Sequence, residues 1–197
     1  MGRRKEFDEN AVLAQAVKRF WSFGYEATSV RELAQHMGIA GASLYNAYGD
    51  KRSLYRRALD FYIENSFKER ERRFEQLPPR AAMQAFLDEL IDRSIHDVDR
   101  KGCMLVNAAL EVAPFDPEFL AVVADVFTQI EAFLLRCAAA GQNDGTISTE
   151  HDAHDIARLF LGAVISIRVL ARTRPEPELL RGMVRPLYAM LEPRAIA

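Results

Sequence analysis

This sequence has few of the features that mark secreted, membrane-bound or disulfide-rich proteins. Only two of its 197 residues are cysteines, Cys103 and Cys137, so a disulfide framework is not expected. No apolar run approaches the roughly 18 residues that cross a membrane, and no signal-peptide pattern opens the chain. We therefore expect a protein of the reducing cytoplasm that makes no use of a membrane.

Patterns typical of β-strands, internal repeats or catalysis are also missing. No Ser/His/Asp order, paired-carboxylate site or phosphate-binding glycine loop stands out. His151, Asp152, His154 and Asp155 are metal-ligating residue types, but they fall at an expected exposed helix start, where acidic residues favour the helix dipole. We therefore expect neither an enzyme nor a resident metal or cofactor.

The charge that is present is unevenly distributed. Apolar residues make up 49% of the chain and charged residues 27%, which is ordinary for a globular protein long enough to bury a substantial core. The net charge of −2 divides into +4 over residues 1–57 and −6 over the remainder. A local basic face is enough to attract phosphates, and the acidic remainder indicates a second task.

The stretch 27–54 predicts two short helices joined by a glycine turn and followed by a third. Ser29 and Glu32 form the S-x-x-E pattern of a capping box, and Gly38 supplies the left-handed residue that ends the helix. Asp50 is suited to cap the next helix. The expected inward residues are Val30, Leu33, Ala34, Met37, Ile39, Leu44 and Ala47. This spacing is that of a helix-turn-helix.

Helical periodicity continues to the end of the chain. It predicts an all-α fold of nine helices. The helix-turn-helix stretch and the charge asymmetry favour two domains, a head of residues 1–54 and a body of residues 55–197. A short basic arm, Gly2–Lys5, precedes the head and is either a DNA-contacting arm or a solubilising terminus. The expected spans are 8–23, two short helices within 27–49, and then 51–77, 81–98, 102–113, 117–140, 150–172 and 178–191.

The run FGYEATSVRELAQHMGIAGASLYNAYGDKRSLY resembles the DNA-binding domain of the tetracycline-repressor (TetR) family of bacterial regulators. The motif covers about the first third of the chain, and the rest fits the family's helical regulatory domain in length and pattern. The resemblance implies a homodimer that binds a pseudo-palindromic double-stranded DNA operator. It further implies a repressor that a small-molecule effector releases from DNA.

Chemistry and resemblance together predict the DNA contacts. Thr28 or Ser29, at a helix N-terminus, can donate to a phosphate. Family positions that commonly clamp phosphates are matched by Tyr45, Tyr48 and Lys51. Positions that can contact base edges are matched by Arg31 and Asn46, Ser43 could contact either, and Ala42 could touch a thymine methyl group. Ala40, Gly41 and Ala42 carry no long polar side chain, so DNA shape should add to specificity.

The resemblance also implies a ligand pocket among the middle helices. Asn107 and Glu111 lie four residues apart on one face of an apolar helix, and Arg168 interrupts the apolar run LGAVISIRVL. With Phe86 and Phe127, these are the candidate ligand-binding residues. Because buried polar groups need partners, an internal hydrogen-bond network of the three polar residues is the alternative.

Cys103 supports a second hypothesis for the signal. It follows Gly102 near a helix start and beside Lys101, and both features favour a thiolate. The segment Gly-Cys-x-x-Val resembles that of family members that sense electrophiles or oxidants. A redox-sensing regulator is therefore the alternative to a ligand-released repressor. Cys103 could instead be a small cysteine that only packs in the core.

The last two helices are expected to form the dimer surface because their apolar faces exceed what a monomer should expose. The predicted interface residues are Phe160, Ala163, Val164, Ile167, Leu180, Val184, Leu187 and Leu191.

Overall fold

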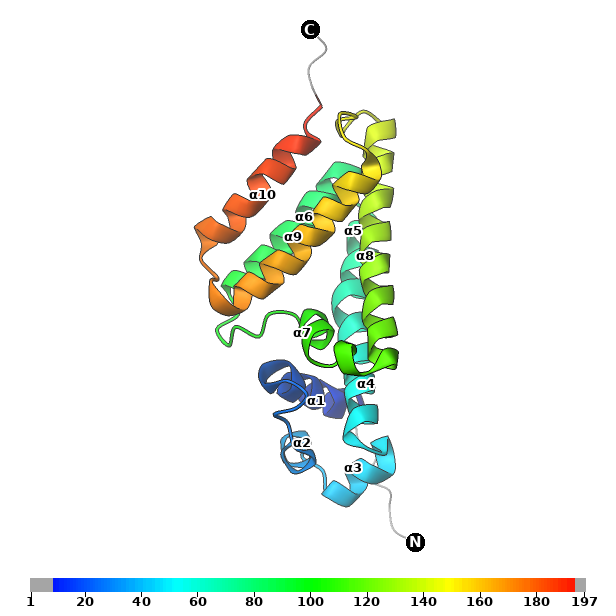
Figure 1. Cartoon of the computed structure of the whole chain (residues 1–197), viewed down its shortest axis with the longest axis vertical. Helices are drawn as coiled ribbons and strands as arrows, with labels where there is room; N and C mark the ends of the chain where they lie inside the picture. Colours follow the sequence, from blue (N-terminus) through cyan, green and yellow to red (C-terminus); the bar gives the residue numbers. More distant parts are fainter. Residues whose placement is uncertain (1–8, 194–197) are drawn as a thin grey trace.

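A computed structural model of the chain describes residues 9–193, so the basic arm Gly2–Lys5 lies outside the described residues. Within that range the fold is all-helical, as predicted. The α-helices are α1 (Glu9–Phe23), α2 (Val30–Met37), α3 (Gly41–Tyr48), α4 (Lys51–Ile63), α5 (Glu69–Phe74), α6 (Pro79–Ile95), α7 (Met104–Glu111), α8 (Pro117–Asn143), α9 (Ala153–Thr173) and α10 (Pro177–Leu191). Figure 1 shows the small head of α1, α2 and α3 at one end of the molecule, with the longer helices above it.

The head confirms the predicted helix signals. The amide of Glu32 donates to Ser29 Oγ at 3.2 Å and the amide of Ser29 donates to Glu32 Oε2 at 2.9 Å, which completes the capping box at α2. Gly38 ends α2 with φ +69°, and Asp50 caps α4 by accepting from the Ser53 amide at 2.7 Å. The inner faces of these helices meet in a buried core, with one difference from the prediction: Ala47 is exposed.

A single helical rod joins the head to the body. The sequence predicts one helix over residues 51–77; the rod ends at Phe74 and consists of α4, a π-helical segment at Glu64–Lys68 and α5. With the rod taken as one helix, the described residues hold the nine predicted α-helices. The predicted domain boundary after residue 54 falls inside α4, where Leu54 and Tyr55 are buried. That boundary stays a prediction.

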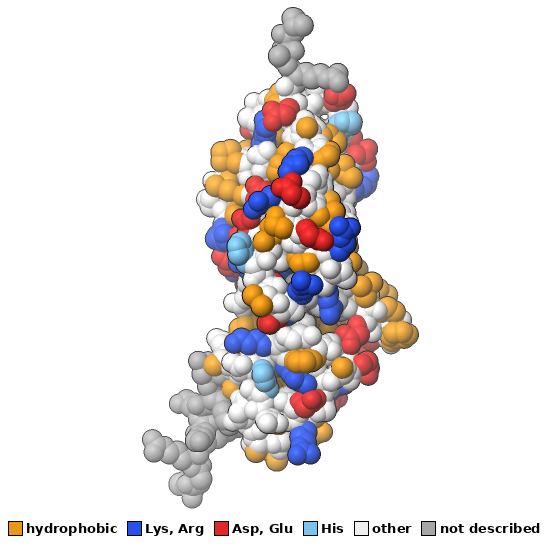
Figure 2. All heavy atoms as spheres, turned by 90° about the vertical axis from the view of Figure 1, so that its left-hand side faces the viewer, with side chains coloured by type: hydrophobic (Ala, Val, Ile, Leu, Met, Phe, Trp, Pro, Cys, Tyr) orange, Lys and Arg blue, Asp and Glu red, His pale blue; other side chains and the backbone are white. Residues whose placement is uncertain are grey.

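The body is a layered bundle. α8 packs along α9, α6 packs against both, and α10 lies against α6 and α9. The short α7 lies between the body and the head, against α8, α4 and α1. Figure 2 shows the side of the molecule that carries α10, where hydrophobic side chains lie among charged ones over the body.

The prediction of the dimer surface is wrong for most of the residues that it named. All of them except Ala163 are buried within the protomer, including Phe160, Ile167 and Leu191 at 0% exposed. The apolar stripes of α9 and α10 therefore pack against α6, α8 and each other. The exposed residues of α9 form a different stripe, which contains Leu159, Gly162 and Val169.

Candidate nucleic-acid interface and ligand cavity

The outer face of α2 and α3 presents polar side chains to solvent. Arg31, Tyr45 and Asn46 are exposed, with Tyr45 at 53%, and Ser43 is half-buried. On the opposite side of α3, Leu44 is fully buried and anchors the helix in the head. α3 therefore holds short polar groups and an aromatic hydroxyl outward on a rigid support. This chemistry suits phosphates and base edges.

Lys51 lies in the first turn of α4. Its ammonium group donates to the Tyr25 carbonyl oxygen at 3.0 Å and lies 4.2 Å from the centre of the Tyr25 ring. This cation is half-buried and pinned to the chain segment between α1 and α2. It is positioned at the first turn of α4 with a fixed side-chain direction.

The body contains a cavity of about 530 Å³ whose wall includes part of the head. α1 contributes Trp21 to the wall, and the rod contributes Tyr62, Phe67 and Arg70 on both sides of and within its π-helical segment. Arg168 of α9 lies on the wall as well. Most of the other wall residues are apolar, from α6, α7, α8 and α9: Phe86, Leu90, Leu105, Val126, Ile130 and Val164. The volume and the mostly apolar wall are those of a small-molecule site.

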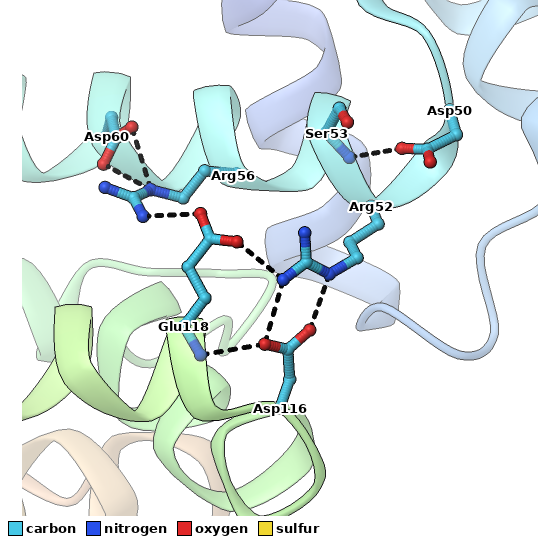
Figure 3. Close-up of polar contacts among 7 residues, drawn as sticks. All are labelled: Asp50, Arg52, Ser53, Arg56, Asp60, Asp116 and Glu118. Atoms are coloured by element: carbon cyan, nitrogen blue, oxygen red, sulfur yellow. Dashed lines mark hydrogen bonds and ion pairs between the residues drawn. The ribbon is translucent and has the colours of Figure 1, made fainter.

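Charged side chains connect the rod to the start of α8 (Figure 3). Arg52 donates to Asp116 Oδ2 at 2.6 Å and to Glu118 Oε2 at 2.6 Å, and Arg56 donates to Glu118 Oε1 at 3.0 Å. Beside this network the Tyr55 ring lies 4.9 Å from Phe20 of the head and 5.3 Å from Phe119 of α8, measured between ring centres. Ion pairs on the outside and aromatic packing inside thus couple α4 to the body.

Comparisons with known proteins agree with this arrangement. The family profile described as "Bacterial regulatory proteins, tetR family" matches residues 12–58, and the profile "Tetracyclin repressor-like, C-terminal domain" matches residues 79–186, which is more than half of the chain. The chain belongs to the TetR family. It is therefore a transcriptional regulator with a helix-turn-helix DNA-binding domain.

This TetR-family chain matches its relatives over most or nearly all of its length. It is 33% identical to the uncharacterized HTH-type transcriptional regulator YezE of Bacillus subtilis (strain 168), over 98% of this chain and 100% of YezE. It is 27% identical to the HTH-type transcriptional repressor ComR of Escherichia coli (strain K12), over 83% and 79% of the two chains. Among solved structures, a cysteine mutant of the TetR family regulator CifR, complexed with 26-bp double-strand operator DNA, aligns with a TM-score of 0.84, 26% identity and coverage of 95% and 98%.

Within the TetR-family head, two predicted DNA contacts are wrong. Thr28 is completely buried, and its hydroxyl donates to the Gly24 carbonyl oxygen at 2.7 Å, so it secures the end of α1. Tyr48 is only 8% exposed, and its ring packs in the head core with the Arg57 guanidinium 5.0 Å from the ring centre. Neither side chain is available to a phosphate. Ser29 is exposed, with its hydroxyl in the capping box.

Of the five predicted ligand residues, the structure brings Phe86 and Arg168 to the cavity wall, whereas Asn107, Glu111 and Phe127 do not line it. Glu111 instead accepts from the Glu26 amide at 2.9 Å, at the junction of head and body. Gly24 adopts φ +83° beside it, and a Cβ there would lie 2.8 Å from the Glu111 carboxylate oxygens.

Asn107 donates to the Lys101 carbonyl oxygen at 3.2 Å. The alternative of a network among Asn107, Glu111 and Arg168 is therefore also wrong. Glu111 of α7 thus holds the chain between α1 and α2 at the junction, whereas Asn107 holds the segment that precedes α7.

Several wall residues have functional positions that the sequence does not predict. The ring of Trp21 packs 5.0 Å from that of Tyr62, between ring centres, and Trp21 also lines the cavity. Arg70 belongs to a charge run that predicts a solvated helix face, yet it is 5% exposed. The sequence around Arg70 does not predict this burial, because the burial depends on packing against α6. That helix supplies Glu89, whose carboxylate lies 3.1 Å from the Arg70 guanidinium.

Cys103 lies on the cavity wall at the N-cap of α7. The contacts of Lys101 do not support its predicted role in activating this thiol. The Lys101 ammonium is paired with Asp97 at 2.8 Å and with Asp99 at 2.7 Å, so its charge is already compensated. Cys103 Sγ instead accepts from the Tyr62 hydroxyl at 3.4 Å. The redox alternative is not favoured.

Metal-binding clusters and membrane-spanning helices do not occur in the described part of the chain. No group of three or more His, Cys, Asp or Glu side chains suited to a metal ion occurs in residues 9–193. Asp152 of the predicted His/Asp group caps α9, accepting from the His154 amide at 2.8 Å. Across the same described range, no helix is both long and apolar enough to span a bilayer.

Proposed function

We propose that this protein is a repressor that binds operator DNA as a homodimer and is released when a small molecule enters the body cavity. The observation that carries this proposal is the composition of the cavity wall. It contains Trp21 of α1, which belongs to the head, and residues of the π-helical segment in the rod. A bound molecule would therefore touch both connections between the cavity and the DNA-binding helices.

Curated relatives support the repressor role. ComR of Escherichia coli and DhaR of a Mycobacterium species, which is 21% identical over 88% of this chain, are both named as transcriptional repressors. On DNA, we assign base contacts to Arg31, Asn46 and Ser43 and a methyl contact to Ala42. Phosphate contacts are assigned to Tyr45, Ser29 and Lys51. All of these side chains except Lys51 lie on or next to the outer face of α2 and α3, and Lys51 lies in the first turn of α4.

The dimer is assigned to the exposed faces of α9 and α10. One recognition helix makes too few contacts for strong specificity, whereas a two-fold dimer contacts two half-sites. At Gly162 of α9 and Gly182 of α10, no described atom outside the local helix lies within 4 Å of the point that a Cβ would occupy, so nothing in the described protomer requires glycine there. Glycine within a helix costs about 1 kcal/mol relative to alanine. Close approach of a partner helix would explain both glycines.

The π-helical segment supplies a means of transmission. π-helical turns are rare and are often found at functional sites, and this one interrupts the rod where Asn65, Ser66 and Phe67 line the cavity. A ligand that changes the hydrogen-bond register at this turn would rotate α4 relative to α5. Because Tyr55 and Arg52 tie α4 to α8, such a rotation would change the position of the head.

The experiment is an anisotropy titration with labelled DNA from upstream of the protein's own gene. Affinity should fall about a hundredfold or more between roughly 50 and 200 mM salt, as for a protein that contacts several phosphates. Tyr45→Phe should weaken binding to all sequences, and Asn46→Ala should reduce discrimination among operator variants. Salt-independent binding, or two variants that behave as wild type, would remove α3 from the DNA interface.

A further inference from the structure

The one buried side chain of the described cavity wall that needs a counter-charge is Arg168. It is 7% exposed, and its guanidinium donates to the Ser94 hydroxyl at 3.1 Å and to the Gly102 carbonyl oxygen. Both acceptors are neutral. Among the described residues, no carboxylate oxygen lies within 4.0 Å of this guanidinium.

The other cations of the wall, except Lys18, each lie within 4.0 Å of a carboxylate oxygen. Arg70 lies 3.1 Å from Glu89, Arg93 lies 2.9 Å from the same carboxylate, and Lys101 is held by two aspartates. Lys18, at the rim, is exposed to solvent. Arg168 is thus the one buried cation of the wall that has no carboxylate partner among residues 9–193.

The titratable groups that act on Arg168 are the Tyr62 phenol and the Cys103 thiol, and neither is a carboxylate. Tyr62 is buried, and this burial raises the pKa of its phenol above the ordinary value, so the phenol is neutral and can act as a hydrogen-bond donor. The rest of the wall is formed mostly by apolar side chains such as Leu90, Leu105 and Val164. An ion in such surroundings is costly unless it is paired.

We propose that the ligand of this cavity is a small organic monoanion, a carboxylate on an apolar body, whose carboxylate group pairs with Arg168. This inference rests on the proposed function only for the existence of a ligand. A guanidinium binds a carboxylate through two parallel hydrogen bonds, which gives both charge and direction. A single uncompensated cation matches one negative charge, whereas a phosphate monoester would bring close to two.

The wall also fits the apolar body of such a ligand. Five aromatic rings line it, from Trp21, Phe61, Tyr62, Phe67 and Phe86. The indole N–H of Trp21 is buried without a hydrogen-bond partner among the described residues. Trp21 is the only tryptophan of the chain, so its fluorescence reports on the cavity.

The test uses three probes that share one apolar chain: octanoate, 1-octanol and octylammonium. Each is titrated into the full-length protein without DNA, and Trp21 fluorescence and the unfolding temperature are recorded. Octanoate should bind at least about tenfold more tightly than octanol, a difference that corresponds to one charge-assisted contact, and octylammonium should bind most weakly. Equal or tighter binding of octanol or octylammonium would overturn the proposal, as would a failure of octanoate to bind.

Variants then locate the preference. Arg168→Gln should abolish the preference for octanoate over octanol while octanol binding persists. Arg172→Gln is the matched control, because Arg172 is exposed one helical turn further along α9. This variant should keep the preference for octanoate over octanol. Cys103→Ala removes a thiol beside Arg168 and should also keep it. If Arg168→Gln does not fold, the wild-type order of the three probes still decides the outcome.

DNA binding separates this inference from the proposed function. If octanoate binds through Arg168 but leaves operator affinity unchanged, the anion site stands and ligand-induced release by such a ligand fails. If a neutral compound releases the operator while carboxylates do not bind, release stands and the anion site fails.

Discussion

The head and the body of this chain place their polar side chains in opposite ways. On the head, Arg31, Tyr45 and Asn46 lie exposed on two short helices. In the body, Arg70 and Arg168 are buried around a cavity and held by specific partners. A surface that meets DNA must be accessible, whereas a cavity that selects a small molecule must orient its polar groups before the ligand arrives. Substitutions on the outer face of the head should therefore change DNA binding without changing stability, whereas substitutions of the buried polar residues in the body should change both function and stability.

Two tyrosines ten residues apart test this difference with the largest expected effect. Tyr55 is 1% exposed and contacts the rings of Phe20 and Phe119, so Tyr55→Ala should cost about 3–5 kcal/mol in the free energy of unfolding. Tyr45→Ala should change that free energy by less than about 0.5 kcal/mol, because the side chain is exposed. Urea unfolding measures both.

Tyr45→Ala, the variant with the smaller effect on stability, should have a clear effect on DNA binding. Tyr45→Ala should weaken operator affinity about tenfold at an unchanged unfolding midpoint. A Tyr45→Ala protein that unfolds as easily as Tyr55→Ala would show that the surface of α3 is part of the fold and that function in the head is not separable from stability.

A second prediction concerns Arg70, the buried arginine of the body that has a carboxylate partner. Burial alone would raise the pKa of Glu89, but the hydrogen bond from Arg73 and the charges of Arg70 and Arg93 outweigh it and hold this pKa below the ordinary value. Glu89→Gln leaves Arg70 buried without a carboxylate. The free energy of unfolding should fall by about 2 kcal/mol, less than for a fully buried pair, because Glu89 retains some exposure.

The pH dependence follows from the same shift. A carboxyl group whose pKa is lowered in the folded state stabilises the fold above its unfolded pKa of about 4.3, and the contribution is lost as the pH falls below that value. Wild-type protein should lose stability between about pH 5 and pH 3, and Glu89→Gln should lose less. Equal pH profiles for the two proteins in urea unfolding would mean that Glu89 does not stabilise Arg70.

A third prediction extends the comparison to assembly and has the smallest effect on the fold. Val169 of α9 is 41% exposed on the assigned dimer face, so Val169→Glu should give monomers in sedimentation and weaken operator binding at least about tenfold. Val98→Glu is the matched control, because Val98 is 94% exposed in the segment between α6 and α7 and is not part of the assigned dimer face. A Val169→Glu dimer of wild-type stability would place the interface elsewhere. Leu187, which belongs to the protomer core, is unsuited to this test.

The head could be predicted from the sequence because its signals are local. The capping box at Ser29 and Glu32 and the turn at Gly38 each involve residues a few positions apart. The error at Tyr48 was avoidable: it lies four residues after Leu44 and therefore on the same buried face. A phenolic hydroxyl suggests a phosphate contact, but the position of the side chain on the helix decides whether it can make one.

The body could be predicted only as far as its helices. Asn107 and Glu111 do share one face of α7, but that face meets Glu26, which is 85 residues from Glu111. Arg168 was predicted to be special because it interrupts an apolar run, and it does line the cavity. The inclusion of Trp21 and Arg70 in the same wall depends on how α1, the rod and α9 pack, and no short pattern encodes that packing.

The most direct test of the central claim, that the cavity controls the head, is a linked titration of operator DNA and a compound that changes Trp21 fluorescence. Coupling between two sites is reciprocal, so the compound should weaken operator affinity by the same factor by which operator weakens the compound. We predict a common factor of at least about ten, within the usual range for allosteric coupling. A compound that saturates the cavity and leaves operator affinity unchanged within about twofold would contradict this claim.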